Sequence, residues 1–427
     1  MQKVSGLQLN ANTQVFQEST LIARFETVRA ATLAIAAPLS PEDMVVQSML
    51  EASPIKWHLA HTSWFFETFI LIENLPAYEV FNPHFKTLFN SYYVSLGACH
   101  PRPQRGMLTR PSLSDILDYR KHVDMAIHHL LEQVVSAQVK SLLELGLQHE
   151  QQHQELMLTD IKHLFFHNPL FPAYLCTDLP SAAPASSLEW IHYEAATRPV
   201  GHAGEGFHFD NETPRHLTHI PSFAITKRLI TNGEYLAFIE AGAYSQTRWW
   251  LAEAVDWINR EAVRHPLYWH YQDGKWFEFT LHGLVPLQLD SPICHINYFE
   301  ADAFARFAGA RLPTEFEWEH VAAEMPVLTA NPHRLHPQGA GEGGSHQPLQ
   351  LYAQVWQWTC SAYAAYPGFS PSAGAVGEYN GKFMVNQYVL RGSSVATPRG
   401  HARPTYRNFF PTGARWQFTG LRLAKSL

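Results

Sequence analysis

The pattern of apolar and polar positions between residues 137 and 166 is that of a helix with one interruption. At about 100° per residue, His149, Gln152 and His153 fall in the same roughly 100° sector as the leucines that precede and follow them. Polar side chains therefore stand on the face that should be buried, and buried polar groups need partners. A metal ion shared by the two histidines is one such partner, and a pair of satisfied core histidines is the alternative.

Few helix breakers interrupt the first part of the chain, and the segments between them predict four long helices. Pro54 stands at a typical helix start, and Ser112 and Ser114 are possible N-caps of the third helix. Four helices in succession predict an up-and-down bundle, a fold that builds metal sites from facing helices. The predicted helices cover approximately residues 14–37, 54–74, 113–134 and 137–166.

A different pattern begins after residue 171. Residues 172–189 are rich in Pro, Ala and Ser and predict a linker. Beyond them the chain has many glycines, aromatic residues and short apolar runs, with helix-like pieces at 231–242 and 297–310. We therefore expect a multidomain α and α+β protein, with a helical bundle over residues 1–171, the linker, and an irregular mixed α+β domain over 190–427.

The second predicted helix offers a third ligand for a metal. Its segment WHLAH contains His58 and His61, either of which could face the bundle interior, and at least one of them is expected to be a core histidine with its own partners. Three neutral imidazoles without a carboxylate suit Zn, Fe or Cu and leave positions for substrate and for water or O2. Asp160 and His163 continue the same face of the fourth helix and are candidates to support the ligands.

Composition and charge restrict the class of protein. The 427 residues carry a net charge of −7, so no basic surface predicts nucleic-acid binding. No stretch of about 18 apolar residues predicts a membrane span, and the N-terminal residues show no secretory signal. The four cysteines lie far apart without a CxxC motif, which predicts reduced thiols in a cytoplasmic protein.

Several short segments, taken together, resemble one enzyme family. HEQQHQE at 149–155 fits the HxxxHxE pattern of the iron-dependent sulfoxide synthases of ergothioneine biosynthesis, and WHLAH resembles the segment that carries their third iron ligand. This family joins a DinB-like four-helix bundle to a formylglycine-generating-enzyme-like (sulfatase-modifying-factor, C-type-lectin-like) domain. Landmarks of that second domain follow in the family's order: DNETPRH, ITNGEYLAFIEAGAY, ARLPTEFEWEHVAA, VWQWTCSAY, VLRGSS and YRNFFPTGARWQFTGLRLA.

The resemblance implies a metal and the residues around it. His61, His149 and His153 would hold Fe(II), with positions left for substrate and O2. Tyr92 and Tyr93 lie in the irregular, aromatic segment between the second and third helices. They match tyrosines that stand near the iron as proton donors in one branch of the family, which suits the acidity of a phenol. Packing at the core or rim is the alternative for one of the two.

The resemblance also assigns residues that bind the two substrates. Gln152 would hydrogen-bond the imidazole of hercynine (Nα-trimethylhistidine), and Asn408 and Phe409 match positions that hold its trimethylated amine and imidazole. Aromatic faces suit a quaternary ammonium, although plain core packing is the alternative for the Phe409–Phe410 pair. An arginine fork would bind the carboxylate of the thiol substrate, unless these side chains are solvated or interdomain arginines. The candidates for that fork are Arg102, Arg105 and Arg415.

One position departs from the mycobacterial type of this family. Those members carry an acidic residue where Phe410 stands here, and the acid is associated with the use of γ-glutamylcysteine. Its absence, together with Tyr92 and Tyr93, favours the branch that uses free cysteine. The expected activity joins the sulfur of cysteine to C2 of the hercynine imidazole and oxidises that sulfur to a sulfoxide with O2. The alternatives are a γ-glutamylcysteine donor, an ovothiol-type synthase acting on histidine, a DinB-like thiol transferase, or a non-catalytic ligand-binding protein.

Overall fold

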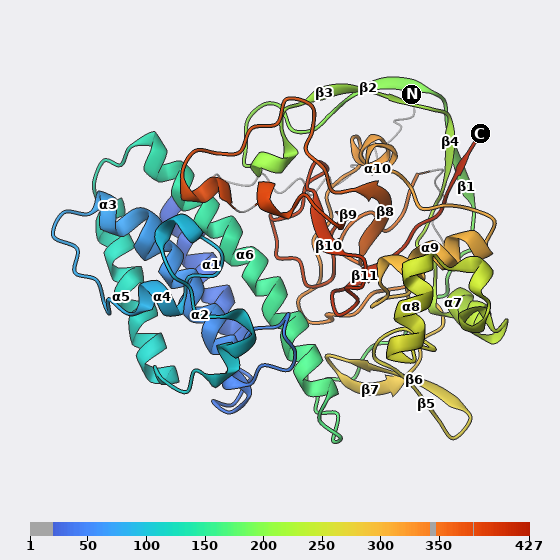
Figure 1. Cartoon of the computed structure of the whole chain (residues 1–427), viewed down its shortest axis with the longest axis horizontal. Helices are drawn as coiled ribbons and strands as arrows, with labels where there is room; N and C mark the ends of the chain where they lie inside the picture. Colours follow the sequence, from blue (N-terminus) through green and yellow to red (C-terminus); the bar gives the residue numbers. More distant parts are fainter. Residues whose placement is uncertain (1–19, 342–346, 379) are drawn as a thin grey trace, which may run out of the picture.

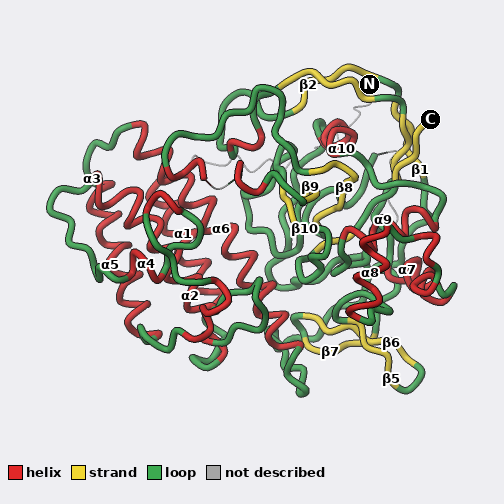
Figure 2. Tube along the Cα trace, viewed as in Figure 1, coloured by secondary structure: helices red, strands yellow, loops and turns green. Residues whose placement is uncertain are grey.

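The helical first part of the chain is present in the computed structural model, which describes residues 20–341, 347–378 and 380–427. The long helices of this first part lie on one side of the molecule, and the strands lie on the other side together with shorter helices (Figures 1 and 2). The first helix was expected from about residue 14, and its part before residue 20 lies outside the described residues. The bundle contains α1 (Leu21–Ala36), α2 (Ile55–Phe66), α3 (Ile72–Asn74), α4 (Phe85–Leu88), α5 (Leu113–Leu131) and α6 (Ala137–Phe166).

Local signals set the ends of these helices. α2 begins directly after Pro54, and a π-helical turn over Glu67–Leu71 joins it to α3, so the predicted second helix is one continuous helical segment. Ser112 caps α5, because its Oγ accepts from the Asp115 N–H while the Asp115 carboxylate accepts from the Ser112 N–H. The other suggested cap, Ser114, is wrong: this reciprocal pair starts the helix at residue 113 and places Ser114 inside it.

The second part of the chain mixes short helices with small sheets, as its pattern predicted. The largest sheet has the strand order β10-β9-β8-β11, and β1-β4-β12, β5-β6-β7 and β2-β3 form smaller ones. The helix-like pieces of the sequence are α7 (Asn232–Glu240) and α9 (Tyr298–Phe307), and the other helices are α8 (Ala252–Glu261) and α10 (Glu315–Ala322). The strands are β1 (Trp190–Tyr193), β2 (Ala196–Val200), β3 (His216–Ile220), β4 (Phe223–Thr226), β5 (Trp269–Gln272), β6 (Lys275–Thr280), β7 (Gly283–Pro286), β8 (Trp356–Ala362), β9 (Gln387–Gly392), β10 (Asn408–Pro411), β11 (Thr419–Gly420) and β12 (Ala424–Ser426).

α6 lies between the other helices of the bundle and the second domain (Figure 1), and it is enclosed along its middle. His149, Glu150 and Gln154 are all buried although they point in different directions around the helix. Gly146 allows α2 to approach α6 closely, because a Cβ at this position would lie 2.5 Å from Cε1 of Phe66. The polar middle of α6 is therefore surrounded by protein, and each of its side chains needs a partner there.

The two domains pack on one shared apolar core. The core of the bundle continues into the second domain through residues such as Tyr268, Phe279 and Phe418. The segment that the sequence predicts as a linker runs without helix or strand, but it is bound to both domains. The Tyr174 N–H donates to the carbonyl oxygen of Leu281 at 2.9 Å, and its hydroxyl donates to that of Ile35 at 2.9 Å. The relative position of the domains is thus held by packing as well as by the chain connection.

Two further expectations concern the membrane and the cysteines. No helix in the described part of the chain combines the length and the apolar character that crossing a membrane requires. All four cysteines are free thiols: Cys99 and Cys176 are exposed, Cys360 is half-buried, and Cys294 is buried.

A buried carboxylate organises the bundle side of α6. Glu150 is fully buried and accepts hydrogen bonds from Arg29 Nη1 at 2.9 Å, from Thr32 Oγ1 at 2.6 Å, and from Arg120. Burial by itself would raise the pKa of this carboxyl, but Arg120 and Arg29 outweigh burial and lower the pKa to about 2. Glu150 is therefore a charged group that joins α6 to α1 and α5.

Replacing Glu150 with Ala should lower the free energy of unfolding by about 3–5 kcal/mol, because the buried Arg120 loses its counter-charge and the buried Arg29 keeps only Asp124. Urea denaturation followed by circular dichroism measures this loss. Glu144 on the same helix provides the matched control, since it pairs with Arg24, whose side chain is 42% exposed. Glu144→Ala should cost less than about 1 kcal/mol, and equal losses for the two variants would contradict this account of the bundle.

Candidate metal centre and substrate cavity

Three imidazoles meet between α2 and α6. His61 on α2 and His149 and His153 on α6 are buried, and one ring nitrogen of each lies within 4.8 Å of the others. Within the described residues, this is the one group of three His, Cys, Asp or Glu side chains with such spacing. The two α6 histidines are one helical turn apart, and the third comes from the facing helix. This arrangement is able to hold a metal ion.

Hydrogen bonding around the rings favours a cation between them. Nδ1 of His61 donates to the carbonyl oxygen of Phe89 at 2.6 Å, which leaves the lone pair of the neutral ring on Nε2. This Nε2 lies 3.2 Å from Nε2 of His149. The buried Nδ1 of His149 has no hydrogen-bond partner among the described residues. Two facing ring nitrogens need a proton or a metal ion between them, and a site of three histidines fits iron, zinc or copper.

The surroundings keep all three rings neutral. Burial is the largest cause that lowers the pKa of each ring, and it brings the pKa of His149 to about 4. The indole of Trp57 stacks on the His61 ring with centroids 4.5 Å apart, which excludes water from that side. Neutral imidazoles keep a lone pair at neutral pH, so the site is ready to bind a metal without first losing protons.

The histidines open onto a cavity of about 480 Å³ between α6 and β10. This volume is in the usual range for small-molecule sites. His61 itself lies deeper and does not line the cavity. The cavity brings together most of the site residues that the sequence singled out, namely Tyr92, Arg102, Arg105, His149, Gln152, His153, Asn408, Phe409 and Phe410.

The wall opposite α6 is aromatic. Phe409 on β10 stacks on Tyr363, with ring centroids 4.1 Å apart and planes 9° apart. The ring of Phe383 lies 5.9 Å from Phe409 and 5.7 Å from Tyr92. Tyr92 belongs to the first domain and Phe383 to the second, so the cavity is closed by rings from both.

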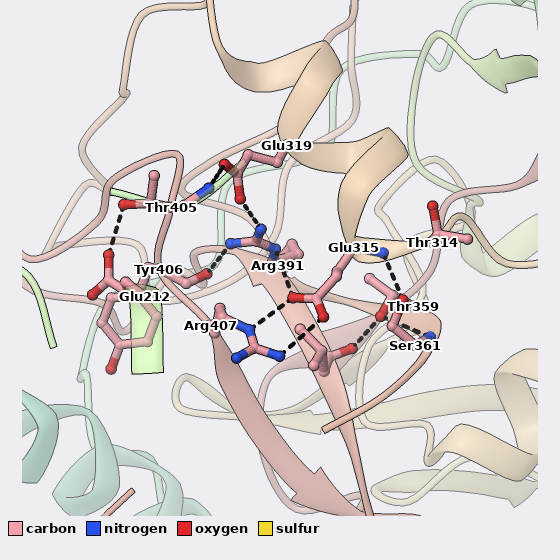
Figure 3. A network of polar contacts seen from close by, with 12 residues as sticks. Glu212, Thr314, Glu315, Glu319, Thr359, Ser361, Arg391, Thr405, Tyr406 and Arg407 are labelled. Carbon is pink, nitrogen blue, oxygen red and sulfur yellow. Dashed lines mark hydrogen bonds and ion pairs between the residues drawn. The ribbon is translucent and has the colours of Figure 1, made fainter. Parts of the chain in front are cut away.

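A buried network of ion pairs fixes the chain that leads into β10 (Figure 3). The guanidinium of Arg407 donates to both carboxylate oxygens of Glu315, at 2.8 and 3.0 Å. Arg391 donates to Glu319 and also to the carbonyl oxygen of Tyr406 at 2.8 Å. Separating such a pair would leave an unpaired charge in the protein interior, which is costly, so the partners stay together. Tyr406 and the start of β10 are therefore held in place from behind.

The polar face of α6 is bound by this second domain. Gln152 Nε2 donates to the Tyr406 hydroxyl at 2.8 Å. Glu155 accepts from Trp356 Nε1 at 2.7 Å and from Thr397 Oγ1 at 2.8 Å. The interruption of the apolar stripe thus has two explanations, since part of it forms the histidine site and part of it fastens the domains together.

Arg105 is a buried cation that lines the cavity without a carboxylate partner. Among the described residues its partners are the Ser53 hydroxyl, at 2.9 Å from Nη1, and the Trp57 ring, whose centroid is 3.5 Å from the guanidinium carbon. The buried Nε of Arg105 has no hydrogen-bond partner among the residues that the structure describes. Burial and the nearby Arg102 lower the pKa of Arg105 to about 9, which leaves it charged at neutral pH. The exposed Arg102 donates to the carbonyl oxygen of Glu51.

The structure separates the remaining candidates. Tyr92 lines the cavity described above, whereas the buried Tyr93 lines a second cavity of about 750 Å³ that shares His149 and Gln152 with the first. Arg415 lines neither cavity. Its guanidinium instead lies 3.6 Å from the Glu300 carboxylate and over the ring of Trp257.

The choice between the two histidines of WHLAH is decided by their surroundings. His58 does not join the three-histidine group but lies beside it, with Nδ1 2.7 Å from Nδ1 of His153 and Nε2 3.0 Å from Asp160.

The cavity also contains Phe383 and Tyr406, which sequence reasoning missed. Tyr406 stands within the YRNFF segment and could have been found there, whereas no signal marks Phe383.

Known proteins resemble both halves of the chain. Residues 24–157 match the DinB superfamily, and residues 191–340 match the sulfatase-modifying factor enzyme 1-like domain. The chain is 30% identical over 399 residues to hercynine oxygenase of Mycobacterium tuberculosis, which covers 87% of this chain and 91% of that protein. It is 30% identical over 405 residues to hercynine oxygenase of Mycolicibacterium smegmatis, with coverage of 87% and 91%. Ergothioneine biosynthesis protein 1 of Schizosaccharomyces pombe is 28% identical over 235 residues, covering 52% of this chain and 28% of that protein.

A DinB-like bundle with three facing histidines, closed by a domain of the sulfatase-modifying-factor type, defines a class of two-domain oxygenases. The relatives that share this architecture over most of their length are hercynine oxygenases. The chain belongs to the hercynine oxygenase family.

We expect the protein to bind one divalent metal ion per chain through the three histidines. His61→Asn should weaken Co(II) binding by more than about 100-fold, the upper end of the range for residues that only support a ligand. Isothermal titration and the visible spectrum of bound Co(II) measure this. His163 on α6 is a buried histidine outside the group, bound to Ser48 and His167, so His163→Asn should leave the affinity unchanged. Unaltered binding in His61→Asn would remove the metal from this position.

Proposed function

We propose that this enzyme joins the sulfur of free cysteine to C2 of the hercynine imidazole and oxidises that sulfur to a sulfoxide, using Fe(II) and O2. The reaction balances without a further reductant: the C2–H and S–H bonds break, a C–S bond forms, one oxygen atom of O2 goes to sulfur, and the other leaves as water. The observation that supports this proposal is one cavity that brings together the three-histidine site, an arginine without a carboxylate partner among the described residues, and an aromatic wall.

His61, His149 and His153 would hold the iron. Bound iron would supply the redox chemistry with O2 and a binding position for the substrate thiolate, which is the form of sulfur that ligates metals. The protein contributes neutral ligands and a dry wall formed by Trp57. Holding both substrates in one closed cavity provides the proximity that C–S bond formation requires.

The thiol substrate would lie at the arginine side. Cysteine carries a carboxylate, and the buried Arg105 is a cation without an anionic partner among the described residues. Arg102 lines the same cavity and would assist from its rim. The γ-glutamyl group of the alternative donor carries an additional ammonium and carboxylate, whereas Phe410 presents an apolar ring where other family members have an acid. This supports free cysteine as the thiol donor.

Hercynine would lie against β10. Gln152 is held by Tyr406 and would direct its amide at the imidazole, and Asn408 would contact the opposite end. A trimethylated amine cannot donate a hydrogen bond, so it is bound by aromatic faces. Phe409 and Phe383 provide such faces in this cavity.

Tyr92 would be the proton donor. Its ring lines the cavity that contains His149, His153 and Arg105, and its phenol is an acid of suitable strength for delivering a proton from Oη to the oxygen that leaves as water. Tyr93 lines the neighbouring cavity and packs on Trp64 with ring centroids 5.6 Å apart. A role in packing is therefore favoured for Tyr93.

A panel of reactions tests the proposed function. Protein stripped of metal and reloaded with Fe(II) receives O2, hercynine or histidine, and cysteine or γ-glutamylcysteine, and mass spectrometry identifies the products. We expect hercynylcysteine sulfoxide from free cysteine. The γ-glutamyl product would contradict the interpretation of Phe410, and coupling to histidine instead of hercynine would indicate an ovothiol-type synthase. Folded, iron-loaded protein without any coupled product would refute the proposed activity.

Tyr92→Phe should shift the products from the coupled sulfoxide towards cysteine sulfinate. Without the proton donor, both oxygen atoms of O2 can go to the cysteine sulfur, since RSH and O2 combine to RSO2H without loss of water. The ratio of the two products, measured by mass spectrometry, reports the shift. Tyr93→Phe is the matched variant and should change this ratio less. An unchanged ratio in both variants would exclude the tyrosines as proton donors.

A further inference from the structure

A chain of buried hydrogen bonds leads away from the three-histidine site. His58 lies on α2 one turn before His61, and Asp160 lies on α6 two turns after His153. His58 fits between the two α6 residues: its Nδ1 is 2.7 Å from Nδ1 of His153, and its Nε2 is 3.0 Å from the Asp160 carboxylate. His58 is 2% exposed and Asp160 6%, so both are largely shielded from bulk solvent at the wall of the cavity.

The order of donors and acceptors in this chain determines which nitrogen of His153 is protonated. A carboxylate only accepts, so Nε2 of His58 donates to Asp160. A neutral His58 then has its lone pair on Nδ1, and this nitrogen accepts a hydrogen bond from the Nδ1–H of His153. His153 is left with its lone pair on Nε2, the nitrogen that faces away from His58.

The same carboxylate is also bound to the thiol side of the cavity. Oδ2 of Asp160 accepts from the backbone N–H of Ser53 at 2.9 Å. The Ser53 hydroxyl in turn accepts from Arg105 Nη1 at 2.9 Å. Ser53 is 4% exposed and Arg105 5%, so this branch of the hydrogen bonds is buried to a similar extent.

We propose that His58 and Asp160 are positioning residues that orient His153 towards the metal and, through Ser53, hold Arg105 in the same frame. The role of His58 is to fix the tautomer and the ring angle of His153. The role of Asp160 is to fix His58 and the backbone that supports the arginine. The inference rests on the proposed function for the identity of the substrates, but the metal part of it does not depend on turnover.

Co(II) affinity in the absence of substrate tests the first half. His58→Phe keeps an aromatic ring but removes the acceptor for His153, and it should weaken Co(II) binding 10- to 100-fold. His58→Asn retains an acceptor near the position of Nδ1 and should recover part of that loss. Asp160→Asn should also weaken binding, and His163→Asn should not. Near-ultraviolet circular dichroism verifies that each variant is folded, and if His58→Phe is not, Asp160→Asn and His58→Asn decide the outcome.

Two results would overturn this half of the proposal. One such result is that folded His58→Phe and Asp160→Asn bind Co(II) with an affinity within twofold of that of the unmodified protein. The hydrogen bonds through His58 and Asp160 would then not position His153. A loss in His58→Asn as large as that in His61→Asn would show that His58 is itself a ligand.

The KM for cysteine tests the link to Arg105. Asp160→Ala should raise this KM several-fold because the Ser53 N–H loses its acceptor, whereas His163→Asn, which lies outside these hydrogen bonds, should leave it close to the original value. Equal KM values in all three proteins would refute the link. Failure of the reaction panel with the expected order of Co(II) affinities would refute the proposed function and retain the positioning role, so the two failures are distinguishable.

Discussion

The burial of the middle of α6 on all sides is the constraint on which the rest of this structure depends. A helix in this position cannot leave a polar side chain to water, so each one must find a partner within the protein. Glu150 finds its partners in Arg29 and Arg120 on the bundle side. Glu155 finds its partners in the second domain. His149 and His153 meet His61 of α2, while His153 also contacts His58, so a cation is the natural complement of the three facing rings.

The same constraint explains why the site needs both domains. The bundle provides the histidines, Tyr92 and Arg105, while the second domain provides β10 and the ring of Phe383. Neither half encloses the cavity by itself. The shared apolar core and the polar contacts of α6 join the two halves, and they place the groups that would bind two small substrates around one cavity.

Charge is distributed unevenly around the cavity, and this bears on the choice of substrates. Arg105 and Arg102 line the side of the first domain, whereas the β10 side presents aromatic rings, amides and Arg407, whose charge is paired with Glu315. A carboxylate is favoured at the first side and a bulky cation at the second. Phe410 belongs to the apolar side, which supports the proposal of free cysteine as the thiol donor.

The sequence by itself determined the helices, the change of architecture after residue 171 and the histidine pair on α6, because these depend on periodicity and on spacing within one element. It also named most residues of the cavity through short segments that resemble one family. It left open whether His58 or His61 completes the group, it kept Arg415 among the candidates, and it did not find Phe383. Those questions concern residues on different elements, and their answers depend on the packing of α2 against α6 and of the second domain against both. Only the tertiary structure therefore decided that His61 turns its Nε2 towards His149 while His58 turns towards Asp160.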